Sequence, residues 1–280
     1  MKIRFIISVF FLISFFSINA QEGFSVNANL KTEPTDRIDF TESNIGIFFN
    51  KNISEKNKIT NTLEYSNLKV NYEVGSNESV ENPDQFNRIQ NRFEISHELS
   101  NSIKLNLALT PTINFQRNID VNDLSLLGSF EINKQLNSKT TINIGVARAT
   151  FLGNAKFLPT LSLNYKISNE SNVLIGFPDS RISYSNNIRN KFSLTNSFNG
   201  NYYYLDTQNT LNSNGEKVTL SQMTSAFEYE RNVDKNWFLN FKAGYDFDKK
   251  YNIIDTDNHK VYDFSTGNGY ILGIGIKYKQ

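Results

Sequence analysis

The chain ends with the stretch 268–280, NGYILGIGIKYKQ. Every second residue is large and apolar or aromatic, and glycines and lysines take most of the positions between: the large residues are Tyr270, Leu272, Ile274, Ile276 and Tyr278. Because successive side chains of a β-strand point to opposite faces, this alternation predicts a strand with one apolar and one polar face. A tyrosine stands at each end of the apolar face.

The same alternation recurs along the chain. It is clear in residues 103–116, 157–167 and 237–248, and weaker near 24–31, 38–52, 58–72, 87–99, 124–135, 140–151, 172–177, 180–185, 190–205 and 217–231. No stretch shows a sustained helical period. Within 58–72 the apolar phase slips between Tyr65 and Leu68, which predicts a β-bulge. Short polar turns alternate with longer loops at 74–86, 116–123, 206–216 and 249–267, which indicates an antiparallel meander.

Two architectures suit such a meander: a soluble sandwich or barrel with its apolar face inside, and an outer-membrane barrel with that face outside. Tyr270 and Tyr278 lie about 26 Å apart along a strand, or roughly 20 Å in height at a tilt of ~40°, which is close to the apolar band of an outer-membrane barrel. Predicted strands of ~10–14 residues also exceed the usual five or six of soluble sheets. We therefore predict an all-β, transmembrane, antiparallel up-and-down β-barrel.

We expect about 14 strands in this barrel, with 12 as the alternative count, and the choice depends on residues 172–185. An even number places both termini and the tight turns on the periplasmic side, with the longer loops outside. The first and last strands must pair, because an unpaired backbone group in hydrocarbon costs several kcal/mol.

The first residues have the layout of a secretory signal peptide. Lys2 and Arg4 precede an apolar run over 5–16, and the small residue Ala20 ends the segment. This run is too short to span a membrane as a helix, so we expect a signal peptide at 1–20 and a barrel at 21–280. The chain has no cysteine, which excludes disulfides and thiolate metal sites. A net charge of +1 argues against nucleic-acid binding.

Charged side chains alternate with apolar ones deep inside the predicted strands, which a wet barrel interior tolerates. The residues expected to line the lumen are Arg88, Arg92, Glu94, Lys104, Lys166, Lys242 and Asp246. Aromatic residues mark the two edges of the apolar band in such barrels, and the residues expected there are Tyr165, Trp237, Tyr270 and Tyr278. We expect no cofactor and no metal.

Residues 173–194, VLIGFPDSRISYSNNIRNKFSL, have a turn followed by a short strand, a polar turn and a returning strand. Together with the signal peptide, the TPT and LPT strands and the glycine-rich last strand, this segment resembles a family of uncharacterised outer-membrane β-barrel proteins of Gram-negative bacteria. The resemblance covers most of the mature chain. It implies the fold and the outer-membrane location, and no activity.

The sequence contains only incomplete catalytic and metal-binding motifs. His97 shares a strand face with Phe93 and Ile95, whereas Ser96 points to the other face, so the two do not form a nucleophile–base pair. His259 lies near Asp255, Asp257 and Asp263, but the glycine and the later glutamate of a calcium loop are missing. We therefore expect no enzyme.

The leading functional hypothesis is passive passage of small hydrophilic solutes through an outer-membrane barrel. The alternatives are a non-conducting structural or ligand-binding barrel that acts through its extracellular loops, and an outer-membrane hydrolase. The expected partners are outer-membrane lipid, the barrel-assembly machinery and small hydrophilic solutes.

Overall fold

A computed structural model describes residues 23–72, 83–206 and 215–280. The predicted signal peptide and most of the predicted loops 74–86 and 206–216 lie outside these residues. In the described part of the chain, no helix is long and apolar enough to cross a membrane.

The structure is built from strands and one short 3₁₀ turn. The strands are β1 (Gly23–Pro34), β2 (Ile38–Asn52), β3 (Asn57–Tyr72), β4 (Gln85–Ser100), β5 (Ile103–Phe115), β6 (Leu124–Asn137), β7 (Thr140–Ala149), β8 (Lys156–Lys166), β9 (Ser171–Phe177), β10 (Asp179–Ser185), β11 (Asn190–Tyr204), β12 (Lys217–Asp234), β13 (Trp237–Ile254), β14 (Lys260–Asp263) and β15 (Gly269–Lys279), and the 3₁₀ turn η1 is Val121–Asp123.

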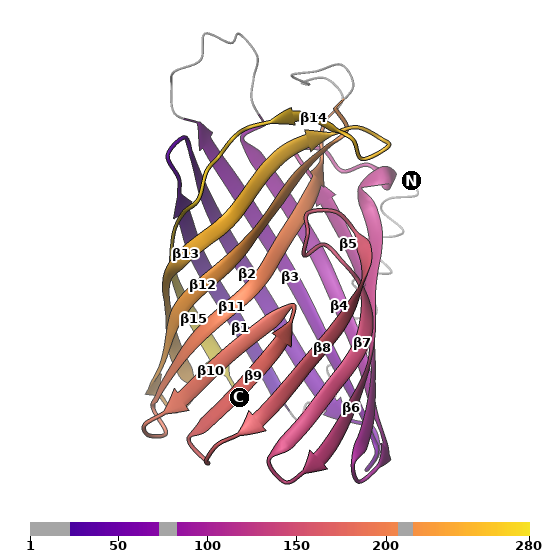
Figure 1. The fold of residues 1–280 in the computed structure, drawn as a ribbon, viewed down its shortest axis with the longest axis vertical. Coiled ribbons are helices and arrows are strands. Elements are labelled where there is room, and N and C mark those ends of the chain that lie inside the picture. The colour runs from indigo at the N-terminus through magenta and orange to yellow at the C-terminus, as the bar shows by residue number, and fades with distance from the viewer. Residues whose placement is uncertain (1–22, 73–82, 207–214) are drawn as a thin grey trace.

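Consecutive strands pair antiparallel from β1 to β13, and the last strand closes the sheet into a barrel (Figure 1). β15 pairs with β13 on one side and with β1 on the other, where Ile274 lies opposite Leu30. β14 pairs only with the end of β13, so it adds no strand to the wall. The wall therefore has fourteen strands, which confirms the predicted count, and the short β9–β10 hairpin belongs to it.

The two ends of the barrel differ in their connections. One end carries the tight turns, and the beginning of β1 and the end of β15 also lie there, since Ser25 pairs with Lys279. We call it the turn end. The other end carries all the longer connections, including the β13–β15 connection that contains β14, and also the short β1–β2 and β9–β10 connections (Figure 1). We call it the loop end.

Over the middle of the barrel and towards the turn end, the apolar residues of each strand lie on the outer face. Leu161, Ile175 and Ile274 are more than half exposed there. Glycine, lysine, asparagine and serine take the inner positions. The C-terminal stretch follows this rule: Leu272, Ile274 and Ile276 point outwards. This arrangement is that of a transmembrane barrel, whose outside is apolar and whose inside is polar.

Towards the loop end this alternation reverses its phase. In β2, Ile45 and Ile47 face outwards, whereas Ile38 and Phe40 face the interior and are buried. In β3, Leu68 and Val70 lie opposite Glu42 and Phe40 on the inner face. The pairings of β3 with β2 and β4 run without a register shift across this region. The predicted bulge between Tyr65 and Leu68 is therefore wrong, and the slip marks a change in which face is apolar.

The wall is also lower on one side of the barrel. β9 and β10 have seven residues each, and their hairpin turns well below the ends of the neighbouring long strands (Figure 1). Beyond this hairpin, β11 continues until Tyr204 pairs with Phe115 at the end of β5. The β7–β8 connection fills the space above the hairpin, where the Thr150 hydroxyl donates to the Gly200 carbonyl at 2.7 Å. At the loop end, opposite parts of the wall therefore come together.

Candidate functional site: a polar chamber below an apolar seal

The inner side chains near the loop end form a hydrophobic core that crosses the barrel. We call this core the seal, and its residues are Ile38, Phe40, Leu68, Val70, Phe86, Tyr203, Val218, Leu220, Tyr251 and Ile253. They come from two parts of the wall, β2–β4 and β11–β13. Since both parts contribute to one buried cluster, the interior is filled with protein at this level.

Aromatic contacts join the two parts of the wall across the seal. Phe86 of β4 stacks on Tyr203 of β11 with ring centroids 4.9 Å apart. Phe40 of β2 meets Tyr251 of β13 edge to face at 5.3 Å, and the Tyr72 and Tyr251 hydroxyls lie 2.9 Å apart. Phe264, from the connection after β14, packs on Tyr251 at 4.5 Å. This connection therefore covers the seal from the loop side.

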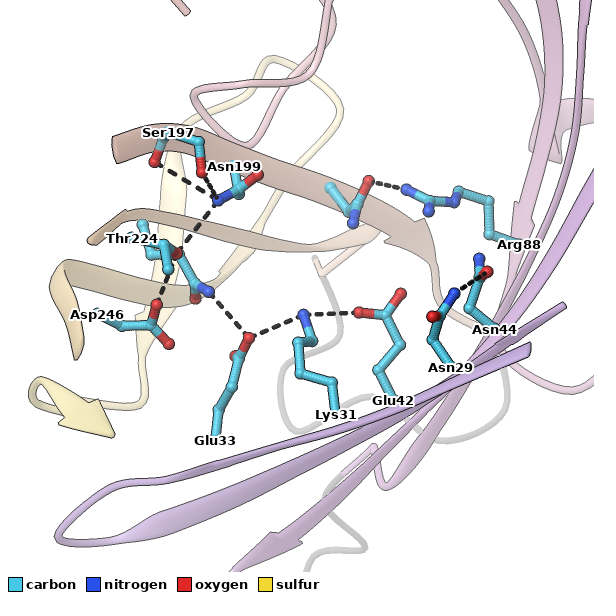
Figure 2. Close-up of polar contacts among 12 residues, drawn as sticks. Asn29, Lys31, Glu33, Glu42, Asn44, Arg88, Ser197, Asn199, Thr224 and Asp246 are labelled. Atoms are coloured by element: carbon cyan, nitrogen blue, oxygen red, sulfur yellow. Dashed lines mark hydrogen bonds and ion pairs between the residues drawn. The ribbon is translucent and has the colours of Figure 1, made fainter. Parts of the chain in front are cut away.

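A layer of paired charges lies directly beneath the seal; Glu33, Asp246 and Lys249 in it are buried, whereas Lys31 and Glu42 are partly exposed. We call it the ionic layer, and its members are Lys31, Glu33, Glu42, Asp246 and Lys249. Lys31 bridges Glu33 and Glu42, at 2.8 Å in each case, and Lys249 pairs with Glu33 and, at 3.5 Å, with Asp246. The ammonium of Lys249 also lies 4.3 Å from the centre of the Phe40 ring in the seal. Figure 2 shows Lys31, Glu33 and Glu42 reaching inward towards Asp246 and Thr224 on the facing wall.

Neutral side chains complete the bonding of this layer. The Thr224 hydroxyl donates to Asp246 at 2.6 Å, and the Gln222 amide donates to Glu33 at 3.1 Å. On the other side, Arg88 pairs with Glu64 at 3.2 Å and donates to Asn201 across the barrel. Removing one partner of a buried ion pair leaves an uncompensated charge, so such layers are sensitive to single substitutions.

Below the ionic layer the interior opens into a polar chamber with two lobes. The lobe next to the layer, ≈ 280 Å³, is lined on the inner face by Asn29, Lys31, Arg181, Lys191, Ser193, Glu228, Glu230, Asn240, Lys242, Gly273 and Gly275. The lobe at the turn end, ≈ 660 Å³, is lined by residues of β7–β11 and their turns, including Lys139, Thr141, Asn164, Lys166, Glu170, Asn172, Arg181, Ser183 and Lys191. Arg181 and Lys191 line both lobes, so the lobes adjoin.

The seven residues expected in the lumen all lie on inner-face positions, but they do not form one group. Lys242 and Lys166 line the chamber. Asp246 belongs to the ionic layer, and Arg88 lies beside it. Arg92 and Glu94 pair with each other along β4 at 2.8 Å. Lys104 lies on β5 opposite Glu98, near the turn end.

Several charged side chains of the chamber and the ionic layer were not singled out from the sequence, among them Lys31, Arg181, Lys191 and Lys249. The first three occupy regular inner positions of predicted strands and could have been found by extending the alternation to the weaker strands. Lys249 could not have been found in this way. The sequence places it in a loop, whereas β13 continues to Ile254 and a bulge opposite Gln222 turns Lys249 inward.

The aromatic residues expected at the band edges lie near the two ends of the outer face. Trp237 and Tyr278 contact each other at the turn end, with centroids 5.1 Å apart, and Tyr165 lies on the last turn-end position of the outer face of β8. Tyr270 lies at the loop-end side of β15, against Tyr245 at 5.3 Å.

Neither histidine forms a catalytic or metal-binding group. His97 Nδ1 lies 2.8 Å from Asn57 Oδ1 on the outer face, whereas the Ser96 hydroxyl donates to Asn106 on the inner face. His259 lies 3.5 Å from Asp255 and is largely exposed. Within the described residues, no three metal-binding side chains come together.

Solved structures similar to this chain are outer-membrane barrels. A mutant of TodX, a monoaromatic hydrocarbon channel, matches with a TM-score of 0.50 and 9% identity, over 96% of this chain and 92% of that one. The COG4313 outer membrane channel from Pseudomonas putida F1 matches with a TM-score of 0.49 and 7% identity, over 94% and 97%. The NanC porin matches with a TM-score of 0.43 and 9% identity, over 91% and 100%. At these identities the likeness shows the fold alone.

The search of curated proteins returned no match. A family described as "Domain of unknown function (DUF6268)" matches residues 19–279, almost the whole chain. This match, with the barrel fold, confirms the resemblance to an uncharacterised family of outer-membrane barrels: the chain belongs to the DUF6268 family.

Proposed function

We propose that this protein is an outer-membrane channel for small hydrophilic solutes, and that the seal holds it shut in the conformation described. The turn end faces the periplasm and the loop end faces outside. Export through a signal peptide cleaved after Ala20, and insertion by the barrel-assembly machinery, are part of this proposal. Fractionation of cells into inner and outer membranes tests the location.

The observation that carries the proposal is the chamber itself. A barrel with a purely structural role gains stability by filling its interior, because unfilled space forfeits packing contacts. This chain instead keeps an adjoining pair of lobes of ≈ 280 and ≈ 660 Å³, whose inner-face side chains are mostly charged groups, amides and hydroxyls. Such a lining suits solutes that enter with their water, and the barrier at the far end consists of side chains that repacking can displace.

The cross-barrel aromatic contacts favour a second candidate, a non-conducting barrel that binds a ligand. If the seal never opens, the chamber remains a blind pocket entered from the turn end. In this case the chamber, and not the loops, is the binding surface. The two candidates share the same chamber and differ only in whether solute crosses the seal.

Single-channel recording in planar bilayers separates the two candidates. The refolded wild type is compared with Phe40→Ala/Tyr203→Ala, which removes one ring from each side of the seal, and with Phe157→Ala, whose ring is 75% exposed on the outer face. We expect brief openings from the wild type and from the Phe157 control. The double variant should stay open for most of the record, because it loses the Phe40–Tyr251 and Phe86–Tyr203 contacts that join the two walls.

Electrophoretic mobility before and after boiling shows which preparations contain a folded barrel, and only these are recorded. If the wild type shows no openings at any voltage but the double variant conducts, the seal is the barrier to conduction, and the wild-type protein is the non-conducting, ligand-binding barrel. Folded variants that remain silent would remove the channel proposal altogether.

A further inference from the structure

We infer that the chamber selects small anions that carry two or more negative charges, such as dicarboxylates or phosphate-bearing solutes. This inference rests on the proposed function, because it names the class of hydrophilic solute that the proposed channel admits. The site is the turn-end lobe together with the two residues that it shares with the lobe above. Its cationic members are Lys139, Lys166, Arg181 and Lys191.

Positive charges outnumber negative charges in the lining of the turn-end lobe. Four cationic side chains line it, and Glu170 is the one carboxylate among its lining residues. Glu170 accepts a hydrogen bond from the Ser168 hydroxyl in the β8–β9 turn. The lobe therefore carries a formal surplus of three positive charges, although the whole chain carries a net charge of only +1. The surplus is local to one side of the interior.

Ion pairs neutralise other charges in the interior but leave most of this surplus. In the adjoining lobe, Glu228 pairs with Arg181 at 3.1 Å and with Lys242 at 3.4 Å, and Glu230 pairs with Lys277 at 3.6 Å. Among the described residues, Lys139, Lys166 and Lys191 have no carboxylate within ion-pair distance. Three free ammonium groups therefore face the lobe.

The opposite part of the barrel wall, formed by β3 and β4, has paired instead of free charges. On the inner face of β3 and β4, Arg88 pairs with Glu64 and Arg92 pairs with Glu94. Positive and negative groups balance there, and such pairs hold each other in place. Like charges gathered in a concave site with low-dielectric walls raise the local concentration of counter-ions. The free lysines are therefore placed to attract anions, and the paired residues are not.

The spacing of the free lysines suggests a ligand with more than one anionic group. Lys166 lies on β8 and Lys191 on β11, three strands or about 14 Å across the sheet, and Lys191 lies two residues nearer the turn end. Asn164, Asn172 and Ser183 lie on the inner face between them. A single carboxylate meets one lysine, whereas a dianion of moderate length contacts both, and the amide and hydroxyl groups between them donate further hydrogen bonds to its anionic oxygens.

Arg181 and Lys191 extend the site towards the seal. Both residues line the turn-end lobe and the lobe beneath the ionic layer. An anion bound at the turn end can therefore pass to the upper lobe without leaving cationic partners. There it reaches Lys242 and Lys31, which already hold carboxylates of the protein.

Calorimetric titration of the detergent-solubilised, full-length mature barrel tests this site. The probes are succinate, inorganic phosphate and the neutral sugar glucose, each at low and at high salt. We expect succinate to bind most tightly, phosphate to bind more weakly because one compact group does not contact both lysines, and glucose not to bind. Lys166→Gln/Lys191→Gln should weaken anion binding at least tenfold, and high salt should weaken the wild type because exposed charges are screened.

Lys56→Gln/Lys134→Gln is the matched control. It removes the same charge from two exposed lysines outside the chamber lining. An equal loss of binding in both double variants would mean that only the total charge matters and would overturn the site. Binding of glucose as strong as that of succinate would overturn the anion preference. Retained anion binding in the Lys166→Gln/Lys191→Gln variant would also overturn it.

Conductance measurements on the Phe40→Ala/Tyr203→Ala barrel keep this test separate from the channel proposal. Anion binding in a barrel that never conducts supports the site and removes the channel. Conductance without selective anion binding supports the channel and removes the site. A reversal potential that shows anion preference, and loses it in the background of Lys166→Gln/Lys191→Gln, supports both.

Discussion

The two ends of the barrel interior are built from the same strands in opposite ways. Towards the turn end, β2 and β3 place Asn44 and Glu64 inside and Ile45 and Leu63 outside. Towards the loop end, the same two strands place Phe40 and Val70 inside. The backbone pleat continues unchanged, and only the residue types exchange faces. A strand therefore does not have one apolar face along its whole length; it has an apolar side wherever water is excluded.

The physical reason lies in what each inner position meets. Near the turn end the opposite walls are separated by a chamber, so inner side chains meet water and polar groups are favoured there. Near the loop end, the opposite walls touch, as the contact of Phe86 with Tyr203 shows. Inner side chains then meet other side chains, and apolar groups are favoured. The ionic layer lies at the boundary, where the charges are paired and Glu33, Asp246 and Lys249 are already buried.

The largest effect should come from breaking the ionic layer. Lys249→Met leaves Glu33 and Asp246 without one buried cation, and we expect a loss of about 3–5 kcal/mol in the free energy of unfolding. Urea titration of the folded barrel, followed by its electrophoretic mobility without boiling, measures this loss. Lys250→Met is the neighbouring control, because Lys250 is exposed and pairs with exposed Asp248. Equal losses for both variants would refute the buried role of Lys249.

Truncation of matched leucines compares the seal with the outer face. Leu68→Ala leaves a cavity in the seal and should cost about 3 kcal/mol of unfolding free energy. Leu161→Ala, on a side chain that is 57% exposed on the outer face, should cost about 1 kcal/mol or less, because lipid fills the space that the alanine leaves. A Leu161 effect as large as that of Leu68 would mean that the outer face packs against protein.

Adding a charge tests which side of the wall meets lipid. Ile175→Lys places an ammonium on the outer face of β9, and we expect a loss of about 2–3 kcal/mol in unfolding free energy in lipid vesicles. The adjacent Leu174→Lys places it in the chamber, whose lining includes Leu174, and should cost less than about 1 kcal/mol. The reverse order of the two losses would mean that the apolar face looks inward.

The smallest effect concerns a loop-end turn outside the spanning strands. Burial, and the charge of Asp120, raise the pKa of Asp123 to about 6. Between about pH 4 and pH 6 the folded state therefore holds this proton more tightly than the unfolded state, so the contribution of Asp123 to stability falls as the pH rises through this window. Asp123→Asn should flatten that part of the pH profile, measured as urea midpoints at several pH values. Identical profiles for wild type and variant would refute the shift.

Much of the wall was predictable because period-2 alternation is a local property. Residues 103–116 and 269–280 are read correctly as strands with an apolar outer face, and the tight turns and the count of fourteen follow from the spacing. The slip after Tyr65 was visible but was interpreted as a bulge. Local sequence cannot tell an inserted residue from a change of surroundings, because both shift the apolar phase by one position.

The chamber was predictable only in part. Lys166 and Lys242 are inner residues of regular strands, and their placement follows from alternation. Their partners do not follow, because Glu228, Arg181 and Lys242 come from β12, β10 and β13. Lys249 depends on a bulge and on the length of β13, and both are set by contacts with β12.

By itself, the sequence determined the strands, their order, the closure of the sheet and the apolar outside of the barrel. These features depend on neighbours along the chain and on pairing between consecutive strands. Only the tertiary structure decided where the interior is filled and where it is open. That decision depends on the distance between strands β2–β4 and β11–β13, which are far apart in sequence and meet because strands β7–β10 between them are shorter.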